Sequence, residues 1–192
     1  MPSFEGMPLE AALGELRSIK SVESVLSVEY EKNDGRLSGD AMMKLSDENL
    51  TLRIYYMGFL TGEITEEEGV IRSTPKLDWS RRVLFVDGLR NCFFWWNITD
   101  YEVEEHDDHY LLRNAHRRLT LNRKTFMPVE QSIEVVGGEM LKITYDTPAR
   151  VNTDNPALQG PSLLSDWYQS RIRIEFGHHV VRATVKSYSF TR

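Results

Sequence analysis

The sequence lacks the residues that would build a disulfide framework or span a membrane. Its 192 residues include a single cysteine, Cys92, which excludes an intramolecular disulfide and a cysteine-rich zinc site. The densest apolar runs are Val83–Val86 and Cys92–Trp96, and both are far shorter than the roughly 18 to 20 residues of a spanning helix. Residues 1–8 hold neither a basic nor an apolar stretch, so no export signal is visible. Such a start is expected either of a cytosolic protein or of a chain whose signal has been removed.

Positive charge and structure-breaking residues are also scarce. The chain has 23 Lys and Arg against 29 Asp and Glu, a net charge of −6, which argues against nucleic acid and anionic surfaces as partners. It contains only 12 glycines and 7 prolines, while 41% of its residues are hydrophobic and 10% are aromatic. This composition predicts an ordered chain, and we expect one domain over residues 1–192.

The sequence has no phosphate-binding glycine loop, no serine-hydrolase elbow, no zinc-protease motif and no paired cysteines. Segment 104–109 (EEHDDH) carries imidazoles and carboxylates that suit a divalent metal, but its place between two strand patterns favours a polar turn. His178 and His179 are adjacent, so on a strand they would point to opposite sides and would not readily chelate one ion. Cys92 has no histidine beside it and is interpreted as a core residue. We therefore expect no catalytic residue, no metal and no cofactor.

What the sequence does contain is hydrophobic periodicity. Residues 26–45 alternate between apolar and polar on both sides of Asn33-Asp34-Gly35, which predicts a β-hairpin, and residues 50–57 predict a third strand. Before them, apolar residues at helical spacing in segment 9–19 predict a short helix. Segment 66–69, three glutamates and a glycine, is interpreted as a solvated turn before a short strand at 70–72. Phe59-Leu60-Thr61 follows the third strand between two glycines, and two interpretations stay open: a buried bend, or an exposed apolar finger that meets a lipid surface or an acyl chain.

The main helix is predicted to begin after Asp78, a suitable N-cap. Apolar residues then recur every three or four positions, at Trp79, Val83, Val86, Leu89, Phe93 and Trp96. Further apolar residues lie outside this stripe, at Leu84, Phe85, Phe94 and Trp95. Because most of the circumference is apolar, the helix must be covered on nearly all sides by protein or by a ligand.

Strand patterns resume after residue 99 and continue to the end of the chain, with hairpin turns at 137–138 and 177–179. The predicted strands are 99–105, 110–113, 118–122, 129–136, 139–145, 170–176 and 180–190. The long irregular segment 147–166, with three prolines, is expected to pack over the sheet or its open edge. The fold class is therefore mainly β (α+β): about ten antiparallel strands that curl into a barrel or part-barrel.

The order of these elements resembles the LolA/LolB-like lipoprotein carrier and receptor superfamily, particularly its LolB side and related bacterial outer-membrane lipoproteins. Arg36-Leu37-Ser38-Gly39, which leads to Leu52-Arg53-Ile54 and the apolar glycine bend, looks like that family's opening. Leu119–Asn122 and Phe126–Gln131 are similar to its later strands. The resemblance implies a curved antiparallel half-barrel with a lid helix and an N-terminal helix over its concave face. It also implies an apolar cavity for acyl chains and a location in the periplasm or at the outer membrane, with lipid-anchored or peripheral membrane association.

Three functions follow as hypotheses. The preferred one is binding of a lipid or an acylated lipoprotein for transport or outer-membrane insertion, with a candidate cavity and tip at Tyr56, Phe59, Leu60, Trp79, Phe85, Leu89, Trp95 and Trp96. The second is a structural or assembly lipoprotein of the envelope, with a filled core and a rim that binds a protein partner. The third is a metal-dependent hydrolase that uses His106, Asp108 and His109.

Overall fold

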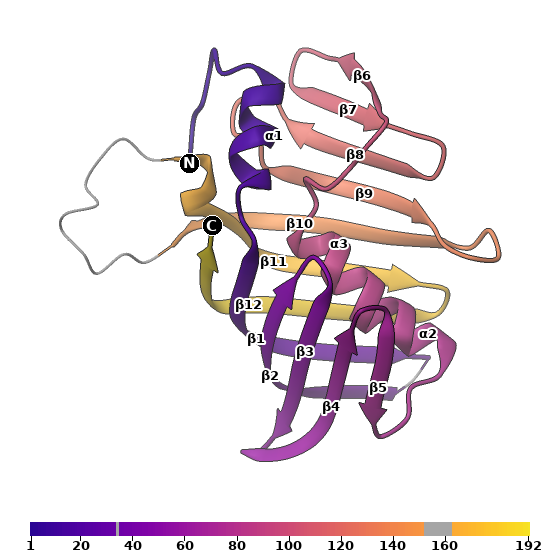
Figure 1. Cartoon of the computed structure of the whole chain (residues 1–192). Helices are drawn as coiled ribbons and strands as arrows, with labels where there is room; N and C mark the ends of the chain where they lie inside the picture. Colours follow the sequence, from indigo (N-terminus) through magenta and orange to yellow (C-terminus); the bar gives the residue numbers. More distant parts are fainter. Residues whose placement is uncertain (34, 152–162) are drawn as a thin grey trace.

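The computed structural model describes residues 1–33, 35–151 and 163–192 as one antiparallel sheet wrapped around a helical segment (Figure 1). The twelve strands lie in the order β5-β4-β3-β2-β1-β12-β11-β10-β9-β8-β7-β6. Their bounds are β1 Ser21–Lys32, β2 Gly35–Ser46, β3 Asn49–Tyr56, β4 Phe59–Glu67, β5 Val70–Thr74, β6 Glu102–Glu105, β7 His109–Arg113, β8 Arg117–Asn122, β9 Pro128–Glu134, β10 Met140–Arg150, β11 Trp167–Phe176 and β12 His179–Thr191. The helices are α1 Leu9–Arg17, α2 Trp79–Arg82, the π-helix η1 Val83–Gly88, α3 Leu89–Phe93 and the 3₁₀-helix η3 Leu164–Asp166.

The sheet is a meander joined in its middle by the first and the last strand. Consecutive strands pair with each other except β5 and β6, which lie at opposite edges, and β1 also pairs with β12 over its whole length, from Ser21 opposite Thr191 to Lys32 opposite His179. As far as the described residues show, the sheet ends at β5 and β6 and is not closed into a barrel. Alternate residues of β1 are buried, as expected where one face of a strand covers the core. The predicted half-barrel fold is confirmed.

Two sequence predictions about strands are corrected. Segment 66–69 was expected to be a turn, but β4 runs to Glu67, and only Glu68 and Gly69 turn the chain, with positive φ at both. Glu66 is paired with Leu50 of β3 and Ile71 of β5, and the Arg90 guanidinium binds its carboxylate at 2.7 Å. Segment 147–166 was expected to be irregular, but β10 continues to Arg150 and η3 precedes β11. Residues 152–162 of that segment, like residue 34 of the first predicted hairpin, lie outside the described residues.

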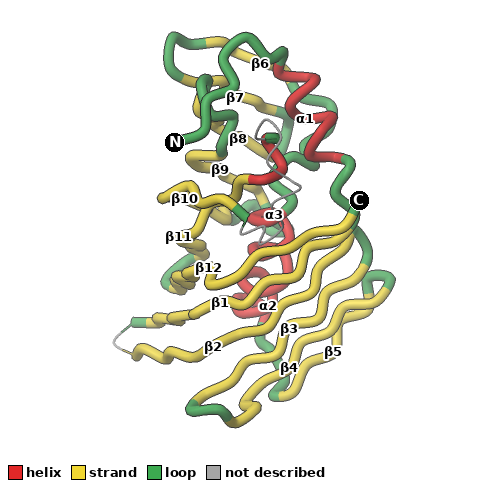
Figure 2. The backbone as a smooth tube through the Cα atoms, turned by 90° about the vertical axis from the view of Figure 1, so that its left-hand side faces the viewer, coloured by secondary structure: helices red, strands yellow, loops and turns green. Residues whose placement is uncertain are grey.

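The helical segment α2–η1–α3 occupies the concave side of the sheet (Figure 2). Asp78 caps it as predicted, since its side chain accepts a hydrogen bond from the Arg81 backbone N–H at 2.9 Å. Val83, Leu84, Phe85 and Val86 are all buried, so η1 is covered on all sides as the sequence predicts, whereas α2 has no buried residue. The segment is not one α-helix to Trp96: its middle is a π-helix, and Phe94 leaves the helix with φ −109° and ψ 45°.

Two contacts fix this segment in the half-barrel. Gly88 lies so close to β11 that an added Cβ would stand 2.9 Å from Cγ2 of Ile174. At the other end, the buried Arg117 guanidinium donates to the Trp95 carbonyl at 2.9 Å and to Oε1 of Gln131 at 2.6 and 2.9 Å. Gln131 in turn donates to the Asn91 carbonyl at 2.7 Å, so carbonyl groups at the end of the helix find donors inside the core.

Helix α1 lies on the same side of the sheet as this segment (Figure 2). It buries Ala12, Leu13 and Leu16, and it ends at Arg17, two residues before the predicted end. Its polar side is tied to the rest of the chain, because the Glu15 carboxylate accepts two bonds from Ser165 at 2.9 Å each.

Substitution by alanine is expected to lower the free energy of unfolding at Gly88 and to raise it at Gly14, because only Gly88 is in close contact with other atoms. Gly88→Ala places a methyl group against the buried Ile174, and we expect a net loss of about 1–2 kcal/mol in the free energy of unfolding because overpacking exceeds the gain in helix propensity. Gly14→Ala in α1 meets no atom within 4 Å, and we expect a gain of about 0.5–1 kcal/mol. Urea unfolding measures both, and equal changes would contradict the proposed packing.

Arg117 gives a second stability prediction. Arg117→Met removes the donor to the buried Trp95 carbonyl and to Gln131, and we expect unfolding to become easier by about 2–4 kcal/mol. Its neighbour Arg118 is exposed, so Arg118→Met is the matched control, with an expected change within about 0.5 kcal/mol. Equal midpoints in urea for the two variants would refute a role of Arg117 in holding the helix end.

Candidate functional site

An apolar pocket of about 540 Å³ lies between the first strands of the sheet and the start of the helical segment. Its walls come from β1 to β5, from the stretch before α2 and from η1. The apolar side chains that line it are Val28, Tyr30, Leu37, Ile54, Tyr56, Ile64, Leu77 and Phe85. The volume falls within the range of about 300–1000 Å³ that is usual for small-molecule sites.

Two glycines leave this space open. Two inward-facing pairs of the sheet line the pocket, Val28 opposite Gly39 and Ile54 opposite Gly62, and the two glycines contribute no side chain to it. At Gly39 a Cβ would come within 2.5 Å of the Tyr55 carbonyl oxygen, so the approach of β2 and β3 requires glycine there. At Gly62 the nearest atoms to an added Cβ are 3.7–3.9 Å away, so a side chain fits and would extend toward the pocket.

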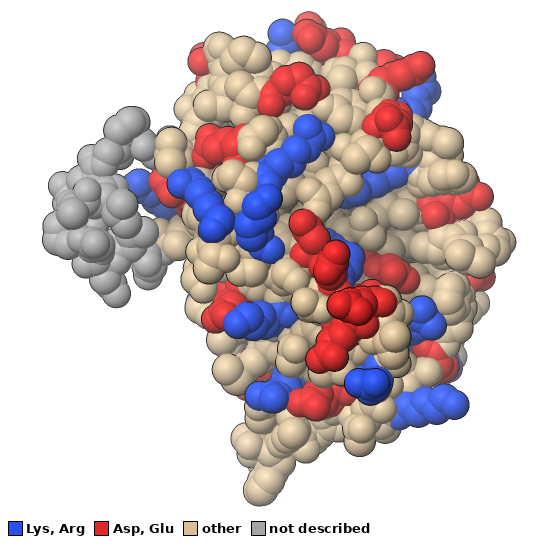
Figure 3. All heavy atoms as spheres, in the orientation of Figure 1, with Lys and Arg blue, Asp and Glu red and all other residues tan. Residues whose placement is uncertain are grey.

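The β3–β4 hairpin next to the pocket ends in an exposed apolar tip. Met57 and Gly58 form the turn with φ of 49° and 83°, and the side chain of Met57 is 80% exposed. Phe59 is 76% exposed, and Tyr56 and Leu60 are also exposed. In Figure 3 this tip is the projection at the bottom, and no charged side chain covers it on that face. Of the two interpretations of this segment, the buried bend is wrong and the exposure of the finger is confirmed, while its contact with a lipid surface or an acyl chain stays a prediction.

One cationic side chain faces the pocket from α2. Arg81 Nε donates to the Tyr30 hydroxyl at 3.4 Å, and the guanidinium lies 5.6 Å from the centre of the Tyr30 ring. The bond to Tyr30 raises the pKa of Arg81, so the group is charged at any physiological pH. The Tyr30 hydroxyl is also bonded to Nδ1 of His179 at 2.6 Å, and burial lowers the pKa of His179, which is therefore neutral near pH 7.

The predicted candidate residues do not all meet at this pocket. Tyr56 and Phe85 line it, and Phe59 and Leu60 lie on the adjacent tip. Trp79 is 45% exposed on α2, where the Arg82 guanidinium lies 5.9 Å from the centre of its ring. The other three candidates are buried in the core and do not line the pocket: Leu89, Trp95 and Trp96.

Three residues that line the pocket were not among the predicted site residues: Gly39, Gly62 and Arg81. The inward position of Gly39 is visible from strand alternation, because it shares the period of Leu37 and Ala41. No sequence signal separates Arg81 from its neighbour Arg82, because the register of the short helix α2 against Tyr30 depends on tertiary packing.

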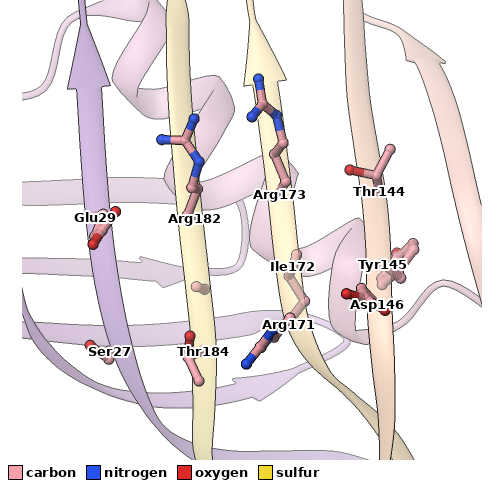
Figure 4. A pocket seen from close by; sticks show the side chains of 11 residues that line it. Ser27, Glu29, Thr144, Tyr145, Asp146, Arg171, Ile172, Arg173, Arg182 and Thr184 are labelled. Carbon is pink, nitrogen blue, oxygen red and sulfur yellow. The ribbon is translucent and has the colours of Figure 1, made fainter.

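A second depression, of about 380 Å³, lies on the outer face of the sheet and is polar (Figure 4). Strands β1, β12, β11 and β10 contribute to it, and Arg173 and Arg182 extend side by side from neighbouring strands. Arg182 binds Glu31 at 2.7 Å and Arg173 binds Glu175 at 2.6 Å, so both cations have acidic partners. The hydrogen bond from Arg182 lowers the pKa of Glu31. We interpret this surface as a solvated face of the sheet.

The candidate metal and thiol residues have ordinary positions. Residues 106–108 form the turn between β6 and β7, as predicted, and the rings of His106 and His109 stack with centres 4.4 Å apart. Among the described residues, no group of three or more His, Cys, Asp or Glu side chains is placed to hold a metal ion. Cys92 is buried, and burial raises the pKa of its thiol far above the usual value, which fits the core position expected from the sequence.

No helix among the described residues is both long and apolar enough to cross a membrane. In comparisons of sequence, no family model and no curated protein matches the chain. Comparison of folds finds a LolA superfamily protein from Nitrosomonas europaea, with a TM-score of 0.58, 16% identity, and coverage of 97% of this chain and 95% of that one. A DUF1329 family protein from Desulfovibrio piger is similar at a TM-score of 0.58 and 8% identity, over 93% of this chain and 88% of that one. At such identities the likeness is one of architecture, and the chain has a LolA/LolB-like fold.

Proposed function

We propose that this protein binds the acyl chain of a lipid or lipoprotein in the pocket between β1–β5 and η1, as a carrier or insertion factor of a bacterial envelope. The observation that supports the proposal is the pocket of about 540 Å³ with mainly apolar walls. If a methylene group takes about 30 Å³, the share of a water molecule in the liquid, there is room for one long chain. Handover of such a ligand requires no catalytic group, and we propose binding without chemistry.

Burial of the chain supplies enough free energy for retention. Each methylene group contributes about 0.8 kcal/mol, so a dozen of them contribute roughly 10 kcal/mol before the cost of ordering the chain. When an acceptor offers an equally apolar site, the chain regains this free energy there, so its transfer out of the pocket costs little. Binding of this kind is tight in water and reversible toward a membrane, which suits a carrier.

We place this handover at the exposed apolar tip of the β3–β4 hairpin. Met57 and Phe59 are largely exposed, and residues 54–62 of this hairpin include no charged residue, as a segment that dips into a lipid surface requires. Peripheral contact with the outer membrane, from the periplasmic side, fits this arrangement and the LolA/LolB-like fold. The alternative function is an assembly factor with a filled core whose rim binds a protein partner, and the buried residues of η1 provide part of such a filled core.

Filling the pocket tests the proposal. Gly62→Leu adds a side chain at an inward position with open space, and we expect the affinity of the protein for a fluorescent fatty acid to fall at least tenfold. Thr65→Leu on the outer face of the same strand is the matched control and leaves the affinity unchanged. The measurement is titration of delipidated protein, with thermal unfolding to verify that both variants fold.

Two results of this titration would overturn acyl-chain binding at this pocket. The first is an unmodified protein that shows no saturable binding of the probe and carries no lipid when purified, which would favour the assembly-factor alternative. The second is an equal affinity in the Gly62→Leu and Thr65→Leu variants, which would place the ligand elsewhere.

The tip gives a separate prediction. The double variant Phe59→Ser/Leu60→Ser removes exposed apolar area, and we expect its partition onto neutral phosphatidylcholine vesicles to fall about tenfold or more. Val136→Ser is the control, because Val136 is 82% exposed in the turn between β9 and β10. Vesicle co-sedimentation measures both, and equal partition of the two variants would contradict a membrane role of the tip.

A further inference from the structure

The charged side chains that line the pocket differ in how fully they are paired with other residues. Three charged side chains belong to its lining: Arg36, Glu63 and Arg81. Arg36 binds the Glu29 carboxylate, and Glu63 accepts from Arg53 Nε at 2.7 Å. Arg36 and Glu63 are the neighbours of inward-facing residues in β2 and β4, so they sit at the rim with their charges directed to the outer face.

Arg81 is different, because its guanidinium is only partly used by the protein. Its Nε donates to Tyr30 at 3.4 Å and lies 3.9 Å from Oδ2 of Asp78. The other carboxylate oxygen of Asp78 is occupied by the helix cap, where it accepts from the Arg81 backbone N–H. Within the described residues the terminal nitrogens Nη1 and Nη2 of Arg81 make no hydrogen bond. Two adjacent donors of a planar cation are thus available beside an apolar pocket.

The side chain of Tyr30 holds the Arg81 guanidinium in position. Tyr30 is buried, its ring is tilted against Phe85 with centres 6.0 Å apart, and its hydroxyl is bonded to His179 at 2.6 Å. Tyr30 therefore offers Arg81 both a ring face and a hydroxyl in a defined orientation. A cation held in this way loses less conformational freedom when it binds an anion, which favours specific recognition.

We propose that Arg81 binds the carboxylate headgroup of a single-chain fatty acid whose tail fills the pocket. This inference rests on acyl-chain binding as proposed above and names the class of ligand. A carboxylate matches the two terminal N–H groups of a guanidinium in one plane, so two parallel charge-assisted hydrogen bonds form. The volume of about 540 Å³ admits one long chain, which favours a fatty acid over lipids that carry two or three chains.

The experiment compares headgroups on one and the same chain. Isothermal titration of the delipidated protein with dodecanoate, dodecanol and dodecyl phosphate varies only the polar end of the ligand. We expect dodecanoate to bind about tenfold more tightly than dodecanol, the factor typical of hydrogen bonds to a partly exposed charged group. Dodecyl phosphate is expected to bind more weakly than dodecanoate, because its tetrahedral headgroup is larger than the planar carboxylate.

Variants of α2 then assign the effect to one side chain. In Arg81→Gln the affinity for dodecanoate falls to that for dodecanol, whereas the affinity for dodecanol is unchanged because the apolar walls are intact. Arg81→Lys keeps the positive charge but lacks the two coplanar N–H donors, and we expect it to restore part of the difference in affinity between dodecanoate and dodecanol. The matched control is Arg82→Gln, since Arg82 lies over Trp79 and does not line the pocket, and it keeps the full preference.

The outcomes separate this inference from the proposal on which it rests. Equal affinity of the unmodified protein for dodecanoate and dodecanol overturns the role of Arg81 and leaves acyl-chain binding intact. A tighter complex with dodecyl phosphate overturns the carboxylate and assigns a phosphate headgroup instead. Absence of binding by all three ligands overturns both proposals. A preference for dodecanoate that survives in Arg81→Gln moves the headgroup site to another residue.

Discussion

The structure depends on a helical segment that is apolar on nearly every side and must therefore be enclosed. The sheet provides the enclosure, and the segment touches it so closely that Gly88 has no room for a Cβ beside Ile174. Enclosure creates a second requirement, because carbonyl groups at the end of a buried helix need donors away from water. Arg117 and Gln131 supply them from β8 and β9, so a buried cation is stabilised by helix-end carbonyls.

The candidate site lies where this enclosure stops. Arg81 of α2 and Phe85 of η1 line the pocket from the helical segment, and the inward positions Gly39 and Gly62 leave part of the facing strands β2 and β4 without side chains. The apolar space that results is bounded on one side by the hairpin tip and on another by Arg81.

Several elements were predictable because their signals are local. The alternation of residues 26–45 gave the first hairpin, and Asp78 was recognisable as a cap because capping involves only the next few residues. Strand β4 was not predicted, since a row of glutamates resembles a solvated turn. Only the tertiary structure places Glu66 between β3 and β5, with its carboxylate bound by Arg90. The exposure of Phe59 was one of two interpretations, because an apolar residue between glycines fits both a core bend and a tip.

The sequence by itself determined the period of each element, the antiparallel meander and the need to cover an apolar helix, since all three follow from spacing along the chain. Tertiary structure alone decided which apolar residues are core and which are site. Trp95 and Trp96 lie in the core while Phe59 is exposed, although all three are large aromatic residues. The physical reason is that burial is set by pairing between distant strands, such as β1 with β12, and by where the helical segment ends against them.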